Sequence, residues 1–391
     1  MQHSRTLLNL GAALLLTLTS CHSRLPEQPL DPSDASTRYA SLLQMQDLDG
    51  GMTLCRILNP WQPERVAAQY LLHPSDSLAD SDIADIEAQF GPVLPLHVPL
   101  QHQALTAACQ ASLYTQLDAL DCIGALCDAD YVLDPQVLAR LDDGSILEAG
   151  GSMAPNTEVL LAARCECIWI TPYEAGSQSM ISAVLPELPI IYCADYMETA
   201  PLARAEWMRF YGRLADRGQR ADSLFDVVER SYLSQQRPVA DTLTSDSATD
   251  VHRPLLLAEL PYGATWYVPG GRSSASWIYQ DAGFGYPWSD DVHGGSLALS
   301  AESVYAQAHD AEVWIFKYYD PDTLWTMPVL LGQHPLYSEF AATQTGRVYG
   351  CNTARTDYFE VAPFRPDVIL NEMRHILRAE NDSLLFFHQL K

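Results

Sequence analysis

The chain has 391 residues, of which 48% are hydrophobic, and its formal net charge is −26 at pH 7. This length is enough for two domains with separate cores. Because proteins that bind nucleic acid need a basic surface, the charge argues against nucleic acid as a partner. It permits docking onto a basic protein surface.

The N-terminus has the pattern of an export signal. A basic residue precedes an apolar run at 7–18 that is too short to span a bilayer. Leu18-Thr-Ser-Cys21 then resembles the bacterial lipobox, although an ordinary signal peptide with a chance cysteine is the alternative. We predict a lipoprotein signal peptide over 1–20, lipidation of Cys21 and firm anchoring. Residues 21–40 are rich in Pro, Ser and Asp, which predicts a flexible tether.

Strand and helix patterns alternate through the next segment, 41–198. Apolar runs predict strands, and helical periodicity predicts helices between them. The strands are expected at 53–58, 68–72, 146–149, 165–171 and 190–194, and the helices at 111–120 and 159–163. This alternation implies a mainly parallel sheet with helices on both faces. We therefore predict an N-terminal α/β lobe over 41–198.

A helical spine is predicted at 199–236. Thr199 can cap its first helix, and Gly218 marks a break. Apolar stripes on either side of this break indicate that the spine packs on both lobes. They consist of Ala203, Trp207, Phe210 and Leu214, and of Ala221, Leu224, Phe225, Val228 and Tyr232. One crossing without a return indicates a two-lobed clamp, in which a small molecule binds between the lobes.

The pattern of the first lobe repeats over 237–391, which we predict to be a C-terminal α/β lobe. Its strands are expected at 255–260, 265–268, 312–318 and 347–349, and its helices at 274–282, 301–309 and 368–377. The predicted fold class is α/β, with two lobes that each hold a mainly parallel sheet and flanking helices, bridged by a single long helical segment.

Eight cysteines remain after Cys21. An exported protein could form disulfides. Most of these cysteines lie in apolar strand-like or helix-like stretches, which is typical of buried small hydrophobic residues. Their spacing matches no zinc site. Free buried thiols are the favoured interpretation, and disulfides are the alternative.

No motif for hydrolysis or metal binding emerges. Neither GxSxG nor HExxH is present. Asp290, Asp291 and His293 could hold a metal, but a solvated acidic turn is favoured. The turn at 269–273 contains two glycines that would allow a ligand to approach, and Arg272 could bind an anionic group. A purely structural turn is the alternative there. We predict no catalytic residues and no metal site.

Six short motifs are spread over about residues 53–380. They are Leu117-Asp-Ala-Leu-Asp-Cys-Ile-Gly124, Pro155-Asn-Thr-Glu158, Glu198-Thr-Ala-Pro-Leu-Ala-Arg-Ala-Glu-Trp207, Trp266-Tyr-Val-Pro-Gly-Gly-Arg272, Gln280-Asp-Ala-Gly283 and Arg365-Pro-Asp-Val-Ile-Leu370. Together they resemble the cluster A (class III) substrate-binding lipoproteins of ABC importers, the group that handles cobalamin, haem and ferric siderophores. The resemblance is closest to versions from the Bacteroidetes.

This resemblance implies the class III periplasmic-binding-protein fold and a docking site for a permease. In the family, a glutamate in a Pro-Asn-x-Glu context pairs with a permease arginine, and that position is Glu158 here. The usual second glutamate falls near Trp277. Close relatives often carry Thr-Thr-His after the first core strand, where this chain has Ala108-Cys109-Gln110. The resemblance therefore implies no axial histidine at that point.

Loops at the carboxyl ends of the strands should face the cleft, and flat aromatic side chains there suit a planar or macrocyclic ligand. The predicted cleft residues are Gln110, Tyr131, Met153, Tyr173, Gly271, Arg272, Trp277 and Tyr318.

The expected function is capture and delivery rather than chemistry. We expect a monomeric periplasmic receptor, anchored to the envelope membrane by lipid, that binds a ferric siderophore, cobalamin or haem between its lobes. It would deliver this ligand to an ABC permease driven by a separate ATPase, and it would hold no cofactor of its own. One alternative is an anchored chelatase or hydrolase, which would need an acid/base pair with shifted pKa values in the cleft. A metal-ion or adhesion lipoprotein is another.

Overall fold

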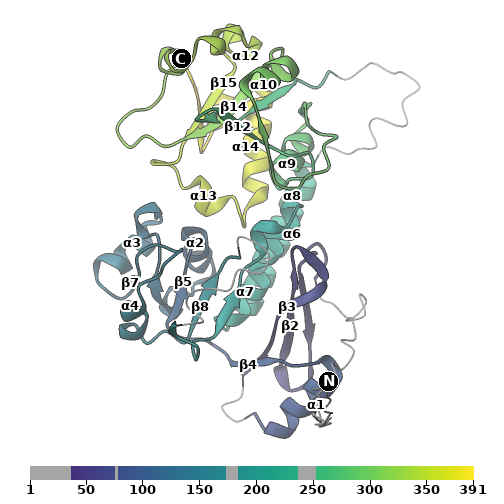
Figure 1. The fold of residues 1–391 in the computed structure, drawn as a ribbon, viewed down its shortest axis with the longest axis vertical. Helices are drawn as coiled ribbons and strands as arrows, with labels where there is room; N and C mark the ends of the chain where they lie inside the picture. Colours follow the sequence, from purple (N-terminus) through teal and green to yellow (C-terminus); the bar gives the residue numbers. More distant parts are fainter. Residues whose placement is uncertain (1–36, 75–77, 173–183, 237–251) are drawn as a thin grey trace, which may run out of the picture.

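The computed structural model describes residues 37–74, 78–172, 184–236 and 252–391. Cys21 and Tyr173 lie outside these ranges. Figure 1 shows two lobes stacked along the long axis, with a helical spine running between them on one side. The predicted α/β fold with two lobes and mainly parallel principal sheets is confirmed.

The principal sheet of the N-terminal lobe has five parallel strands in the order β7-β6-β5-β8-β9. They are β5 (Gln103–Leu105), β6 (Ile123–Leu126), β7 (Leu147–Glu148), β8 (Cys167–Ile170) and β9 (Ile190–Tyr192). The flanking helices are α2 (Ala108–Leu117), α3 (Pro135–Asp142) and α4 (Thr157–Ala162). Helix α2 begins three residues before the predicted start because the Gln110 side chain accepts the backbone N–H of Ala107 at 3.2 Å and so caps the helix.

A second sheet precedes this one. Its strands are β1 (Leu43–Asp47), β2 (Thr53–Asn59), β3 (Gln62–His73) and β4 (Leu94–His97), with α1 (Asp80–Phe90) between the last two. Strands β1, β2 and β3 are antiparallel, and only β3 and β4 are parallel. Apolar runs locate such strands, but they carry no information about direction. In Figure 1 this sheet lies beside the spine, on the side away from the principal sheet.

The spine comprises α6 (Pro201–Glu206), α7 (Met208–Leu214) and α8 (Gly218–Gln235). The expected cap by Thr199 is wrong, because α6 begins after Ala200 and no side chain caps it. The two apolar stripes are buried, apart from the half-buried Leu224. Helix α8 packs against the C-terminal lobe, and α7 packs against α2. The spine therefore contacts both lobes.

The principal sheet of the C-terminal lobe has the order β10-β14-β15-β16. Strands β10 (Leu256–Ala258), β14 (Val313–Tyr318) and β15 (Val348–Asn352) are parallel, and β16 (Phe387–Gln389) is antiparallel to β15. The lobe's helices are α9 (Ser274–Ala282), α10 (Ala301–Ala308), α11 (Met327–Gln333), α12 (Ala341–Thr345), α13 (Tyr358–Val361) and α14 (Pro366–Arg378).

The strand expected at 265–268 lies outside this principal sheet. It is β12 (Thr265–Pro269), and it forms a small antiparallel sheet with β11 (Pro261–Tyr262) and β13 (Ser296–Leu299). Its Trp266 is still fully buried, with its ring 5.8 Å from that of Trp314 in β14. The small sheet thus shares the lobe's hydrophobic core.

All eight cysteines of the described chain are free thiols, and six of them are buried. This agrees with the favoured interpretation of the sequence. None of the helices within the described ranges is long and apolar enough to cross a membrane. Short 3-10 helices complete the fold at 49–51, 120–122, 129–131, 195–197, 335–339 and 381–383.

Candidate ligand-binding site

A cavity of about 490 Å³ lies where the two lobes meet. This volume is within the range of about 300–1,000 Å³ that is typical of small-molecule sites. Its wall comes from the ends of β5, β6, β8 and β9, from the start of the spine, and from the C-terminal lobe after β14 and β15. The lining residues are Thr106, Ala107, Ala108, Cys109, Gln110, Asp128, Tyr131, Leu133, Ser152, Thr171, Asp195, Tyr196, Arg204, Tyr319, Thr353, Thr356, Asp357, Phe359 and Glu360.

Gln110 forms part of the N-terminal wall and is held by the backbone. It is buried, and its Oε1 accepts the N–H groups of Thr106 at 3.0 Å and Ala107 at 3.2 Å. These bonds fix the turn between β5 and α2. The carboxyl ends of the parallel strands meet at this edge of the sheet, as expected for a ligand site in an α/β fold.

An ion pair forms the floor nearest the spine. Arg204 Nε lies 3.2 Å from Asp195 Oδ2, and the second oxygen of Asp195 accepts the Tyr211 hydroxyl at 2.8 Å. Burial and the neighbouring Asp195 carboxylate hold the pKa of Tyr211 well above its usual value. This hydroxyl therefore stays protonated and keeps donating to Asp195.

Glu360 of α13 crosses from the C-terminal lobe to the N-terminal one. Its carboxylate accepts the backbone N–H groups of Leu133 at 2.5 Å and Asp134 at 3.1 Å. Burial raises the pKa of Glu360 to about 7, and the two N–H donors only partly offset this effect. Nearby, the ring of Phe364 meets Tyr211 of the spine edge-on at 6.0 Å. These contacts join the lobes beside the cavity.

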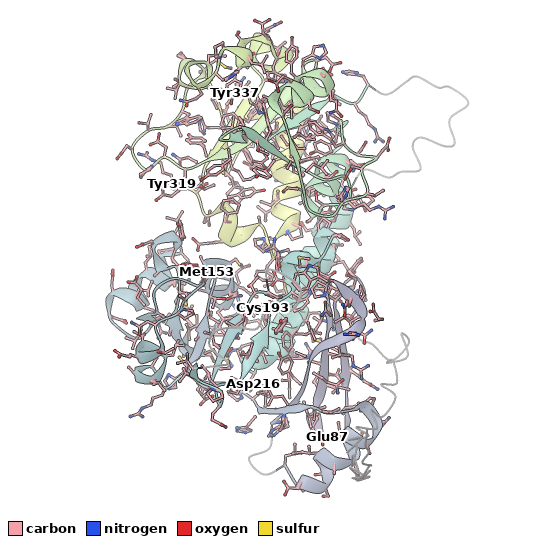
Figure 2. All side chains as sticks on the ribbon, in the orientation of Figure 1. Glu87, Met153, Cys193, Asp216, Tyr319 and Tyr337 are labelled. Atoms are coloured by element: carbon pink, nitrogen blue, oxygen red, sulfur yellow. The ribbon has the colours of Figure 1, made fainter. Side chains whose placement is uncertain are left out.

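The predicted cleft residues are placed differently from one another. Gln110 and Tyr131 line the cavity. Met153 follows the lining residue Ser152, and Figure 2 shows it on the face of its lobe that is turned toward Tyr319 of the other lobe. Tyr173 lies outside the described residues. Gly271, Arg272, Trp277 and Tyr318 are not among the cavity-lining residues of the described chain. As ligand contacts, all eight remain predictions.

The glycine turn at the start of α9 is covered by protein. A Cβ atom added to Gly271 would lie 2.4–2.6 Å from the carbonyl oxygens of Trp288, Ser289 and Asp291. At Gly270 it would lie 2.4 Å from the carbonyl oxygen of His293. The turn therefore requires glycine in order to pack against the segment at 288–295, which supports the structural alternative. Arg272 is exposed outside the cavity.

The predicted cleft residue Tyr318 is one position away from Tyr319, which does line the cavity. Tyr318 is the last residue of β14 and is buried, with its ring stacked on Trp325 at 4.7 Å. Tyr319 comes next, is 62% exposed and lines the cavity. Because neighbouring residues of an extended chain point in opposite directions, an error of one position exchanges a core residue for a cavity residue.

Among the described residues, the cavity wall shows neither an activated thiol nor a metal centre. Burial raises the pKa of the Cys109 thiol to about 12, so it is protonated at neutral pH and a poor nucleophile. No group of three or more His, Cys, Asp or Glu within the described ranges is placed to hold a metal ion. At the candidate acidic turn, Asp291 accepts the backbone N–H of His293 at 2.8 Å, as in an ordinary solvated turn.

Glu158 lies away from the cavity, in the first turn of α4. Its side chain is exposed, and its backbone N–H donates to the capping side chain of Asn156 at 3.0 Å. This position leaves the carboxylate accessible, and its role in docking remains a prediction.

Comparison with known proteins bears on the fold. No family model matches the chain. It is 26% identical over 245 residues to an uncharacterised lipoprotein from Methanocaldococcus jannaschii, covering 61% of this chain and 54% of the relative. The chain thus spans about half the length of the curated relative it matches.

Solved structures show the same fold. An Fe³⁺-hydroxamate transport protein from Saccharomonospora viridis has a TM-score of 0.54 at 17% identity, covering 73% of this chain and 96% of its own. A periplasmic haem-binding protein from Pseudomonas aeruginosa has a TM-score of 0.55 at 15% identity, with 74% and 98% covered. The haem-binding protein of Vibrio cholerae has a TM-score of 0.54 at 13% identity, with 72% and 98% covered. The fold is that of periplasmic binding proteins.

Proposed function

We propose that this protein is the substrate-binding component of an ABC importer, and that it binds a metal chelate or corrinoid between its lobes. The observation that carries the proposal is the cavity at the lobe junction, which both lobes and the spine line. The fold shared with haem-binding and Fe³⁺-hydroxamate proteins supports it. The ligand would be a ferric siderophore, haem or cobalamin. None of the neighbours described above is named for cobalamin.

Delivery and anchoring complete the proposal. A lipid on Cys21 would hold the protein at the envelope membrane of the periplasm, and a permease with its ATPase would receive the ligand from a monomeric receptor. The lipobox pattern and the lipoprotein relative support anchoring.

Cys21→Ser should release the protein from washed membranes into the soluble fraction. If the variant stays on the membrane, the anchoring proposal is wrong.

The alternative of an anchored enzyme receives little support. A chelatase or hydrolase would need a free acid/base pair in the cleft. Glu360 has a raised pKa, but its carboxylate is occupied by two N–H groups of the facing lobe. The Cys109 thiol is protonated at neutral pH.

Filling the cavity tests the binding role. Ser152 lines it from the N-terminal lobe, so Ser152→Trp should occupy the ligand space without disturbing either core. Ser383→Trp, at an exposed site outside the cavity wall, is the matched control. In the detergent-solubilised full chain, we expect at least one of haemin, cyanocobalamin and ferric hydroxamates to bind and to quench the tryptophan fluorescence. Ser152→Trp should lose this response and Ser383→Trp should keep it. Equal responses would place binding elsewhere.

A further inference from the structure

We propose that the cavity selects an uncharged or cationic chelate with apolar ring or chain surfaces, and that it rejects anionic chelates. This inference rests on the proposed binding function and narrows its ligand class. It follows from three features of the wall: its carboxylates, the state of its one arginine, and its exposed aromatic rings.

Carboxylates outnumber basic groups in the wall. Asp128, Asp195, Asp357 and Glu360 line the cavity, and Arg204 is the one basic side chain among its described lining residues. The wall therefore offers an anionic ligand few opposite charges.

Arg204 is already paired. It lies 3.2 Å from Asp195, whose position is fixed in turn by the Tyr211 hydroxyl. An anionic ligand at the Nη groups of Arg204 would share the guanidinium with Asp195, whose negative charge offsets the positive one. The described wall thus contains no basic group whose charge is not already offset by a neighbouring carboxylate.

The remaining acids keep the wall negative even if Glu360 is counted as neutral. Asp357 is exposed at the start of α13. Asp128 is half-buried, and its Oδ1 accepts the backbone N–H of Ser152 at 3.1 Å, which holds it at the cavity edge. These two acids come from opposite lobes. A bound anion would therefore meet negative charge on both sides.

Exposed aromatic rings supply the apolar part of the site. Tyr131 of the N-terminal lobe is 66% exposed, while Tyr319 and Phe359 of the C-terminal lobe are 62% and 58% exposed. Large rings that line a cavity without being buried are available to stack on a ligand. Their faces also attract positive charge. Rings and carboxylates together favour an amphipathic ligand that is neutral or cationic.

The haem-binding neighbours make this inference specific to the present chain. Haem carries two propionates, which are negative at neutral pH and are repelled by nearby carboxylates. The wall described here presents carboxylates instead. The shared fold is thus compatible with a ligand whose charge differs from that of haem.

Four coloured probes test the charge selection on the full chain in detergent at low salt. Cyanocobalamin is neutral and ferrioxamine is cationic, whereas haemin and a ferric tris-catecholate are anionic. We expect the better of the first two to bind about tenfold or more tightly than either anion. Added salt should reduce this difference in affinity, because screening weakens the repulsion between the anions and the wall. Preferential binding of an anion would overturn the charge selection and leave the proposed function intact. Failure of all four to bind would count against both.

A charge reversal provides the matched comparison. Asp357→Arg places a cation in the wall and should raise haemin affinity by about tenfold. Asp382→Arg makes the same change of net charge at an exposed site outside the cavity wall, and it should leave haemin affinity unchanged. Equal effects of the two variants would show that overall charge, and not the cavity, controls haemin binding. No gain with Asp357→Arg would also contradict the proposal.

Discussion

Two carboxylates of the spine region hold the first segment that the structure describes. Glu206 is fully buried and accepts the backbone N–H groups of residues 38–40 at 2.7–3.0 Å. Glu198 accepts those of Ser41 and Leu42 at 2.9–3.0 Å. The tether was predicted to reach residue 40, and its last three residues are bonded to the spine. Bonds to backbone donors are one way in which a buried carboxylate is stabilised.

Trp207 connects these two carboxylates to the hydrophobic core. Its side chain is fully buried, its ring lies near those of Phe210 and Tyr211 in α7, and its Nε1 donates to Glu198 at 3.0 Å. Trp207→Ala should lower the free energy of unfolding by roughly 3–5 kcal/mol, because it leaves a large cavity and removes one donor. The half-exposed Trp277→Ala should cost no more than about 0.5–1 kcal/mol. Urea denaturation of both variants measures the difference, and equal stabilities would contradict the assigned packing.

Helix α13 is the element that brings the C-terminal lobe onto the N-terminal one. It has only four residues, packs against α2, and places Glu360 on two N–H groups of the facing lobe. The other charged groups that raise the pKa of Glu360 are Asp134 across the junction and Asp357 on its own helix. Both are acidic, so they add to the effect of burial.

Closure of the lobes should therefore depend on pH. The pKa of Glu360 rises from an ordinary 4.5 to about 7 when it is buried at the junction. A raised pKa means that burial at the junction favours the protonated carboxyl. The contribution of Glu360 to lobe closure is therefore complete below about pH 4.5 and is lost as the pH rises through about 7. We expect a smaller radius of gyration by X-ray scattering at pH 6 than at pH 8. Glu360→Gln should remove the difference, and its persistence in that variant would assign it to another group.

The long regular elements were predictable, and the short ones that build the site were not. The apolar stripe of α8 gave a strong helical signal, and the continuous apolar run of β14 indicated a strand. Helix α13 is too short to show a period, so the cavity residues Asp357, Phe359 and Glu360 escaped notice. Arg204 appeared only within a motif of the spine, and Asp195 was not predicted to line the site, because the ion pair between them forms only when the chain folds.

At the scale of the whole molecule, the single spine limits how far the lobes can separate. Helix α8 packs on α14, and α6 contacts α9, so the spine is part of the C-terminal core as well. A wide hinge would require these buried contacts to break. Modest closure around the ligand is the expected motion. A receptor with nearly fixed lobes can present docking residues from both lobes to a permease at a defined spacing.

Glu158 is the predicted docking residue of the N-terminal lobe. A structural role is also available, because a carboxylate in the first turn of a helix is worth roughly 0.3–1 kcal/mol through the helix dipole. Glu302 provides a matched control, since it is exposed in the first turn of α10, which Figure 1 shows toward the far end of the other lobe. Any loss from the dipole should be similar at both positions.

Charge reversal at these two positions separates docking from capping. Glu158→Arg should leave ligand affinity normal, because Glu158 lies outside the cavity wall. It should weaken association with the permease, because an arginine would repel the arginine expected there. Glu302→Arg should have the same small effect on melting temperature with normal uptake. Ligand titration of the purified proteins, combined with uptake in cells at matched protein levels, makes the comparison. If uptake survives in Glu158→Arg, the carboxylate serves only its helix, and docking must depend on another part of the surface.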